Sequence, residues 1–327
     1  MKYALCIVLC LVEYSLACGK AKDKPKTEEP KKPRVLILGG IVNAQFRSVR
    51  SVFEFDTSTL RIAENSYNMQ LDRLQLKDAT LHVNPTPASE LYHSRRGFAN
   101  RAPIQTSPEV VARATTQIGE RVFVCGCENE GRVTASCEFY SFTANAWTPF
   151  NEPMPQRVYG AAAVTDNSRF LYVIGGMTNR QRNGRTQVEP TNRAHRLDVH
   201  RRVWGEIAPA PETMQIWNSA VYVAGRSPRP YLLYCGVTYR RIAPKCYTYD
   251  IATDSWTEAA APTGLTGGPK LVRCGGKLFA FGNFADAATE NKLVPVAQVL
   301  DESSKRWQPV TSALMPNIGR FEAICVD

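Results

Sequence analysis

The stretch Leu171-Tyr172-Val173-Ile174-Gly175-Gly176 decides the fold, because it is the clearest copy of a unit that recurs along the chain. Four apolar residues followed by Gly predict a short strand whose Gly lets the backbone turn away. An alternating run then ends at Asp198, and Trp204 stands six residues further on. This order of apolar run, polar turn and Trp predicts antiparallel strands joined as a meander.

The same unit occurs five times along the chain. Its glycines are Gly39, Gly126, Gly175, Gly236 and Gly282. Its turns begin at Asp56, Ser141, Asp198, Asp250 and Asp301. Six residues after each turn residue stand Ile62, Trp147, Trp204, Trp256 and Trp307. We expect each Trp to pack as a wedge against the neighbouring sheet. A four-stranded unit cannot bury both faces alone, so the units should stack into a closed ring.

The repeated Gly, turn and Trp positions make the sequence resemble the kelch family of β-propellers. The resemblance rests on Gly175-Gly176, on the run from Met154 to Gly160, and on the Trp positions. It covers residues 34–327, is strongest over 113–310, and implies an all-β propeller.

The number of blades depends on residues 65–111, which show neither the Gly strand nor the turn-to-Trp spacing. A kelch repeat has roughly 50 residues, so the length of the 34–327 region favours six blades with the second degenerate. Five blades with an insertion is the alternative. We expect strand 320–326 to pair with strand 35–38, so that both ends of the chain share one blade and close the ring.

The N-terminal segment is typical of a secretory signal peptide. Lys2 precedes an apolar run over 5–12, and Ser15-Leu16-Ala17 offers a cleavage site, which predicts a signal at 1–17. A lipoprotein signal ending at Cys18 and a short uncleaved anchor are the alternatives. Residues 18–33, rich in Lys, Pro and Glu, predict a disordered tether before the 34–327 propeller. We therefore expect a secreted, extracellular protein without a membrane span.

Secretion permits disulfides, and the repeat suggests the pairs. Cys125 and Cys235 occupy one repeat position, just before the Gly, while Cys137 and Cys246 occupy another at the start of the next strand. The predicted pairs are Cys125–Cys137, Cys235–Cys246 and Cys274–Cys325. Buried free thiols are the alternative.

Basic residues gather in two neighbouring loops of a chain with net charge +10. The cations there are Arg180, Arg182, Arg185, Arg193, Arg240, Arg241 and Lys245. Connections between blades add Arg157, Tyr159, Trp217 and Arg320 on the same predicted face. The kelch resemblance implies that such loops line a peptide-binding surface. Because arginine binds carboxylate and sulfate in bidentate geometry, we expect a protein-binding module with an acidic partner.

Two alternatives to this surface stay open. One is a propeller that binds or processes anionic glycans, similar to sialic acid mutarotases, and the other is a solvated basic rim. The chain has four His and no nucleophile motif or phosphate-binding Gly loop. Copper radical oxidases of the kelch type need two His at the metal, and no clear ligand set emerges here. We expect no cofactor, no metal, no nucleic-acid partner and no catalytic residues; the oligomeric state is open.

Overall fold

The computed structural model describes sixteen stretches of the chain. These are residues 10–12, 32–38, 41–42, 47–48, 52–64, 89–93, 97–101, 114–119, 121–129, 132–214, 218–224, 229–238, 243–265, 268–282, 292–319 and 321–326. Across these stretches the secondary structure consists of strands and turns without a helix. Accordingly, no helix in the described part is long and apolar enough to cross a membrane.

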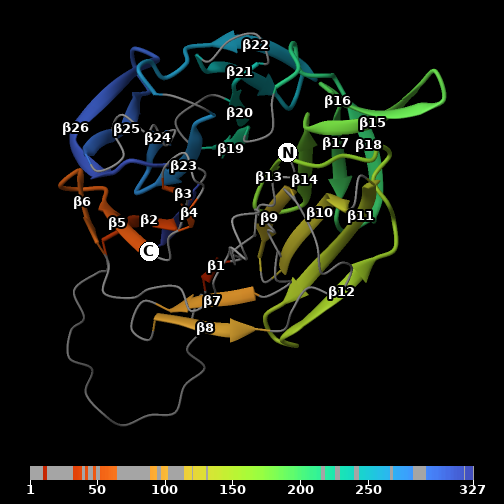
Figure 1. Cartoon of the computed structure of the whole chain (residues 1–327), viewed down its shortest axis with the longest axis horizontal. Coiled ribbons are helices and arrows are strands. Elements are labelled where there is room, and N and C mark those ends of the chain that lie inside the picture. Colours follow the sequence, from red (N-terminus) through yellow and green to blue (C-terminus); the bar gives the residue numbers. More distant parts are fainter. Residues whose placement is uncertain are drawn as a thin grey trace.

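Five four-stranded sheets stand radially around a common axis, as in a propeller (Figure 1). We number these blades I to V along the ring. Blade I contains β28 (Glu322–Val326), β2 (Arg34–Leu38), β5 (Val52–Asp56) and β6 (Arg61–Glu64). Blade II contains β9 (Ala114–Ile118), β10 (Arg121–Asn129), β11 (Arg132–Ser141) and β12 (Ala146–Phe150). Blade III contains β13 (Ala162–Thr165), β14 (Phe170–Ile174), β17 (Ala194–Asp198) and β18 (Val203–Ile207).

The remaining two blades follow the same antiparallel order from the axis outward. Blade IV contains β19 (Ser219–Val223), β20 (Tyr231–Gly236), β21 (Lys245–Asp250) and β22 (Ser255–Ala259). Blade V contains β23 (Lys270–Cys274), β24 (Lys277–Phe281), β25 (Leu293–Asp301) and β26 (Arg306–Pro316). The inner strands contact one another in the order β9, β13, β19, β23 and β28, so the blades form successive sectors of a ring.

Blade I is built from both ends of the propeller region, as predicted. Strand β28 pairs antiparallel with β2, in a register that places Val326 opposite Arg34. The Cys274–Cys325 disulfide then joins the inner strand of blade V to that of blade I. The ring is therefore closed at this point by a sheet and by a covalent bond between neighbouring sheets.

The sector between blades I and II differs from the rest (Figure 1). It holds a three-stranded sheet of β1 (Cys10–Val12), β7 (Ser89–His93) and β8 (Gly97–Arg101). Strand β1 runs parallel to β7, unlike any pair within the five blades. Six blades are therefore not confirmed, because the described residues form five four-stranded sheets. The predicted tether over 18–33 lies outside the described residues except for its last two positions.

The turn between the third and fourth strands is the most regular part of each blade. In four blades an Asp carboxylate accepts backbone N–H bonds from residues two and three positions later, as Asp250 does from Ala252 and Thr253. The residue four positions after the turn residue has a positive φ in every blade. These residues are Leu60, Asn145, Arg202, Asp254 and Lys305. The turn residue therefore fixes the hairpin that presents the Trp strand.

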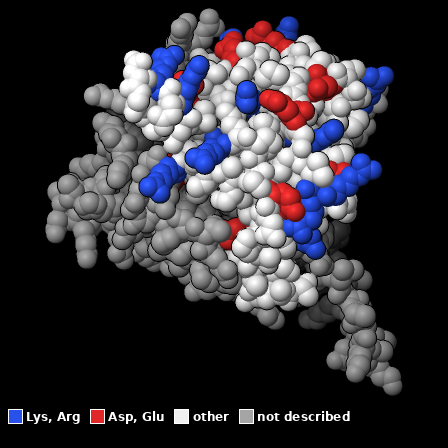
Figure 2. All heavy atoms as spheres, turned by 90° about the vertical axis from the view of Figure 1, so that its right-hand side faces the viewer, with Lys and Arg blue, Asp and Glu red and all other residues white. Residues whose placement is uncertain are grey.

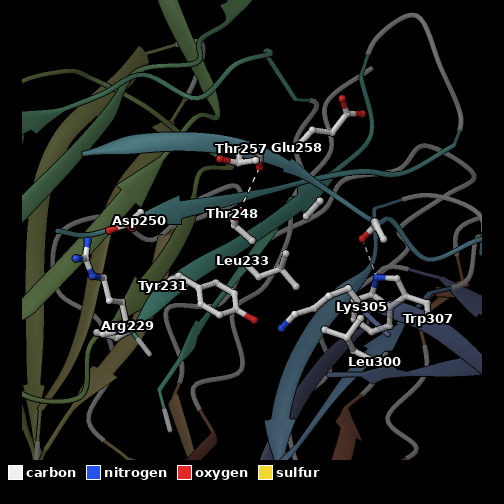
Figure 3. A pocket seen from close by; sticks show the side chains of 13 residues that line it. Arg229, Tyr231, Leu233, Thr248, Asp250, Thr257, Glu258, Leu300, Lys305 and Trp307 are labelled. Atoms are coloured by element: carbon white, nitrogen blue, oxygen red, sulfur yellow. Dashed lines mark hydrogen bonds between the residues drawn. The ribbon is translucent and has the colours of Figure 1, made fainter. Parts of the chain in front are cut away.

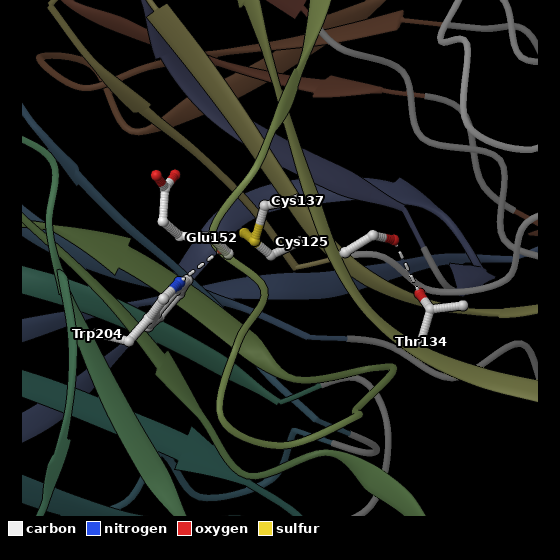
Figure 4. The surroundings of a disulfide bond; sticks show 6 residues. Cys125, Thr134, Cys137, Glu152 and Trp204 are labelled. Atoms are coloured by element: carbon white, nitrogen blue, oxygen red, sulfur yellow. Dashed lines mark hydrogen bonds between the residues drawn. A yellow bond between two sulfur atoms is a disulfide. The ribbon is translucent and has the colours of Figure 1, made fainter. Parts of the chain in front are cut away.

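The tryptophans fasten neighbouring blades together. Trp204, Trp256 and Trp307 each donate their indole N–H to a backbone carbonyl of the preceding blade's exit segment, at 3.1, 2.7 and 2.9 Å. Figure 4 shows Trp204 of blade III reaching the carbonyl oxygen of Glu152 beside the blade II disulfide. Trp147 is also buried. The predicted wedge is confirmed, and its polar edge adds a hydrogen bond that Ile62 cannot make in blade I.

Glycine is required at the ends of these strands because neighbouring atoms leave no room for a Cβ, as predicted. A Cβ on Gly126, whose φ is +64°, would lie 2.2 Å from the Val158 carbonyl oxygen. A Cβ on Gly175, with φ of +66°, would lie 2.6 Å from the Tyr234 hydroxyl. Gly39 lies outside the described residues.

All three predicted disulfides are present. Cys125–Cys137 joins β10 to β11 in blade II, and Cys235–Cys246 joins β20 to β21 in blade IV. The two bonds occupy the same position in their blades, which is why the repeat revealed them. Cys127 is a buried free thiol 3.1 Å from the Thr134 hydroxyl.

Candidate functional site

A two-stranded hairpin projects from the end of β14 in blade III (Figure 1). It consists of β15 (Met177–Arg182) and β16 (Arg185–Pro190). Its turn, Asn183-Gly184, has φ of 50° and 72°, the left-handed conformation that two-residue hairpin turns require. The basic loop predicted over 178–193 is therefore an ordered ribbon.

The register of the hairpin places its charged residues on one face. Arg182 is opposite Arg185, Arg180 is opposite Gln187, and Thr178 is opposite Glu189. Because alternate residues of a strand lie on opposite faces, these positions share a face. The other face holds Asn179, Gln181, Thr186 and Val188. We call positions 180, 182 and 185 the arginine face.

The arginine face is only partly neutralised by neighbours. Arg180 forms an ion pair with Glu189 at 3.3 Å, and its side chain is 61% exposed. Arg182 is exposed at the tip. Arg193, at the base, lies 3.9 Å from Glu206 in an exposed pair. The face that lies to the right in Figure 1 carries both Lys or Arg and Asp or Glu side chains (Figure 2).

The base of the hairpin is held by the connection from blade II to blade III. Tyr159 and Met177 exchange two backbone hydrogen bonds of 3.0 and 2.8 Å. The Thr178 hydroxyl donates to the carbonyl oxygen of Arg157, whose side chain is exposed. Tyr159 is half-buried and therefore positions the hairpin, while Arg157 adds a cation beside its base.

Lys245 has a structural partner. Its ammonium pairs with Glu212, which also accepts a 2.9 Å hydrogen bond from the Tyr247 hydroxyl. The bond to Glu212 raises the pKa of Lys245 above its usual value. This group ties the connection between blades III and IV to strand β21. The other predicted site residues, Trp217, Arg240, Arg241 and Arg320, lie outside the described residues.

Cavities elsewhere on the propeller include two that described residues line. One of about 510 Å³ opens into the central channel and is lined by inner strands, including Thr116, Thr165, Tyr222 and Arg273. One guanidinium nitrogen of Arg273, Nη1, is buried there without an acceptor among the described residues. The second, of about 530 Å³, lies between blades IV and V (Figure 3). Within the described residues no three His, Cys, Asp or Glu side chains are placed to hold a metal ion.

Comparison with known proteins adds one relative. No family model matches the sequence. Over 97 residues the chain is 31% identical to beta-scruin of Limulus polyphemus, a kelch-repeat protein. The radial sheets and this relative support a kelch-type propeller. The match covers 29% of this chain and 10% of the length of beta-scruin. It therefore supports the type of propeller but assigns no function to this chain.

The sequence contained signals for features that the repeat alone did not reveal. Asn183-Gly184, with polar residues on both sides, is a hairpin signal that gives the register of the arginine face. Leu233 and Leu300, which line the cavity between blades IV and V, occupy the repeat positions of Tyr172 and Tyr249 between blades III and IV. The pairing of Lys245 with Glu212, 33 residues apart, has no local signal.

Proposed function

We propose that this propeller is a non-catalytic binding module that recognises an acidic partner protein through the arginine face of the β15–β16 hairpin. The observation that carries the proposal is the register, which gathers three Arg positions on one side of a projecting ribbon. The base of the hairpin is held by the two backbone hydrogen bonds between Tyr159 and Met177, and guanidinium groups suit carboxylates. Arg157, beside the base, extends the cationic surface.

We further propose that the protein acts in the secretory pathway or outside the cell. Three disulfides support an oxidising compartment, and the Lys2-led apolar segment supports a signal peptide at 1–17. A six-bladed ring remains our proposal for the complete domain, with β7 and β8 in the sixth sector, since β1 falls within the proposed signal at 1–17. N-terminal sequencing of the protein recovered from culture medium tests the cleavage site directly.

The binding experiment uses an immobilised peptide of six Glu-Ser repeats, with Gln-Ser repeats as the neutral control. Arg180→Gln/Arg182→Gln/Arg185→Gln should weaken binding to the acidic peptide roughly tenfold, since three exposed charge pairs together contribute about 1–2 kcal/mol. The matched control is Asn179→Glu/Gln181→Glu/Thr186→Glu, which changes net charge by the same amount on the opposite face. It should weaken binding less than about threefold.

Equal losses in the two triple variants would refute the arginine face, because only net charge would then matter. Retention on heparin at physiological salt without binding to the Glu-Ser peptide would favour the anionic-glycan alternative instead.

A further inference from the structure

The hydrophobic cluster in each groove between neighbouring blades includes two side chains at fixed repeat positions. One stands three residues before the Gly that ends the second strand. The other stands immediately before the turn residue of the following blade. The pairs are Phe123 and Leu197 between blades II and III, Tyr172 and Tyr249 between III and IV, Leu233 and Leu300 between IV and V, and Phe279 and Phe55 between V and I.

Of these four described grooves, only the one between blades IV and V has no aromatic ring at either position. Between blades III and IV the Tyr172 and Tyr249 ring centroids lie 6.4 Å apart, and both rings are fully buried. Between blades V and I the rings of Phe279 and Phe55 lie 5.0 Å apart. In the groove with two leucines there is instead the cavity of about 530 Å³, a volume typical of small-molecule sites.

Two aromatic side chains, Tyr231 and Trp307, line this cavity among aliphatic and polar residues. Trp307 lines it while its indole N–H is held by the Ala260 carbonyl oxygen at 2.9 Å. Tyr231 lines the other side, with Leu233 buried beneath it (Figure 3). The Thr248 hydroxyl bonds the Thr257 carbonyl oxygen at 3.3 Å, which ties the outer two strands of blade IV together along the same wall. We call this cavity the slot; two aromatic side chains line it, and one of them is held by a hydrogen bond.

The polar end of the slot holds a hydrogen-bond donor, whereas the equivalent positions of blades II and IV hold an acceptor. In blades II and IV the Tyr before the turn donates its hydroxyl to the positive-φ residue, Tyr140 to Asn145 at 2.6 Å and Tyr249 to Asp254 at 2.7 Å. In blade V the positive-φ residue is Lys305, and Leu300 supplies no hydroxyl. A ring in this slot would therefore meet an ammonium donor where a native tyrosine meets an acceptor.

The charges around the slot are mixed, because Arg229 and Lys305 share the lining with Asp250 and Glu258, and Glu302 interacts electrostatically with Tyr231. In Figure 3 the Lys305 ammonium and the Tyr231 hydroxyl point toward one another across the cavity. No carboxylate of the described residues forms an ion pair with Lys305. Arg229, at the other end, interacts electrostatically with Asp250, whose carboxylate is already bonded to its own turn. Lys305 is therefore the cation that can bind a ligand carboxylate on the side of the slot that faces Tyr231.

We propose that the groove between blades IV and V binds a small aromatic acid, with the ring between Leu233, Leu300 and Trp307 and the carboxylate at Lys305. The ring occupies the space that tyrosines fill in the preceding groove, and the carboxylate accepts from the ammonium and from the Tyr231 hydroxyl. The site lies at the turn ends of the blades. The β15–β16 hairpin follows the opposite end of a second strand, so the site is independent of the arginine face.

The test measures binding of 4-hydroxyphenylacetate to the full chain by calorimetry and by Trp fluorescence. Two analogues separate the contributions: cyclohexylacetate keeps the acid without the aromatic ring, and 2-(4-hydroxyphenyl)ethanol keeps the ring without the acid. The aromatic acid should bind about tenfold more tightly than either analogue. No detectable binding of the aromatic acid, or equal binding of cyclohexylacetate, overturns the proposal.

Variants then locate the site. Leu300→Tyr should abolish binding by filling the slot, and Leu300→Tyr/Lys305→Asn recreates the Tyr140–Asn145 pair of blade II, which gives a second filled slot expected to fold. Lys305→Met should weaken the acid about tenfold and leave 2-(4-hydroxyphenyl)ethanol unchanged. The matched control, Lys292→Met, removes an exposed cation of the same blade outside the lining and should change neither. Binding that survives in both slot-filling variants overturns the assignment.

Discussion

Blade V meets its two neighbours in different ways. Its junction with blade I contains a cluster of Phe55, Phe279 and Phe281 rings with centroids 5.0 to 6.1 Å apart, and the Cys274–Cys325 disulfide. Among the described residues, its junction with blade IV has neither an aromatic pair at the equivalent positions nor a disulfide. It packs through an aliphatic cluster and is joined by the Trp307 hydrogen bond and by a bond of 3.1 Å from the Leu271 N–H to the Ser219 hydroxyl. The two junctions are therefore joined differently. Aromatic rings and a disulfide join blades V and I, whereas the junction that has the Trp307 hydrogen bond also contains the cavity.

The difference follows from what each blade offers at the repeat positions. Blade I has Ile62 where the others have Trp, so it cannot donate an indole N–H to blade V. Its junction is stabilised instead by buried rings and a covalent bond. Blade V does have its Trp, and the space left by Leu233 and Leu300 is available to a ligand. Stability and binding are thus divided between the two sides of one blade.

The largest effect is expected from removing the disulfide that joins blades V and I. Cys274→Ser/Cys325→Ser should lower the free energy of unfolding by about 4 kcal/mol, because the bond constrains a long loop in the unfolded chain. The sequence separation is 51 for this pair and 12 for Cys125–Cys137. The matched variant Cys125→Ser/Cys137→Ser should therefore cost less, about 3 kcal/mol. Urea unfolding of both variants measures the order, and a larger loss for the blade II pair would contradict it.

A smaller effect distinguishes the filled junction from the open one. Phe55→Ala should cost about 3 kcal/mol or more, since it removes a fully buried ring that contacts two others. Leu300→Ala should cost only about 1 kcal/mol, because Leu300 is half-buried and already borders a cavity. Equal losses in urea unfolding would show that the groove between blades IV and V is as well packed as its neighbour.

Much of the fold was predictable because repetition exposes equivalent positions. The Gly, turn and Trp offsets located the strands, and matching Cys125 with Cys235 located two disulfides by their shared place in the repeat. The open groove needs a further step, which is to know that Leu233 and Leu300 face each other across two sheets. That relation is set by strand register and by which sheet faces which, and neither is local in sequence. The same holds for the arginine face, whose composition was visible but whose single-sided arrangement depends on cross-strand pairing.

The smallest expected effect on stability concerns the turn that begins at Asp56, between the third and fourth strands of blade I. Hydrogen bonds from Ser58 and Thr59 lower the pKa of Asp56 from 3.8 to about 2. A carboxyl whose pKa is lower in the folded state stabilises the fold above the unfolded pKa, and this contribution is lost as pH falls from about 5 toward 2. Asp56→Asn should therefore lower the urea midpoint slightly at pH 7 and leave it nearly unchanged at pH 2. Ser141→Asn alters the equivalent turn of blade II without a titrating group, so its effect should be the same at both pH values. A penalty for Asp56→Asn that does not shrink on acidification would show that the carboxylate charge contributes nothing to this turn, and that the Asp and Ser turns are stabilised alike.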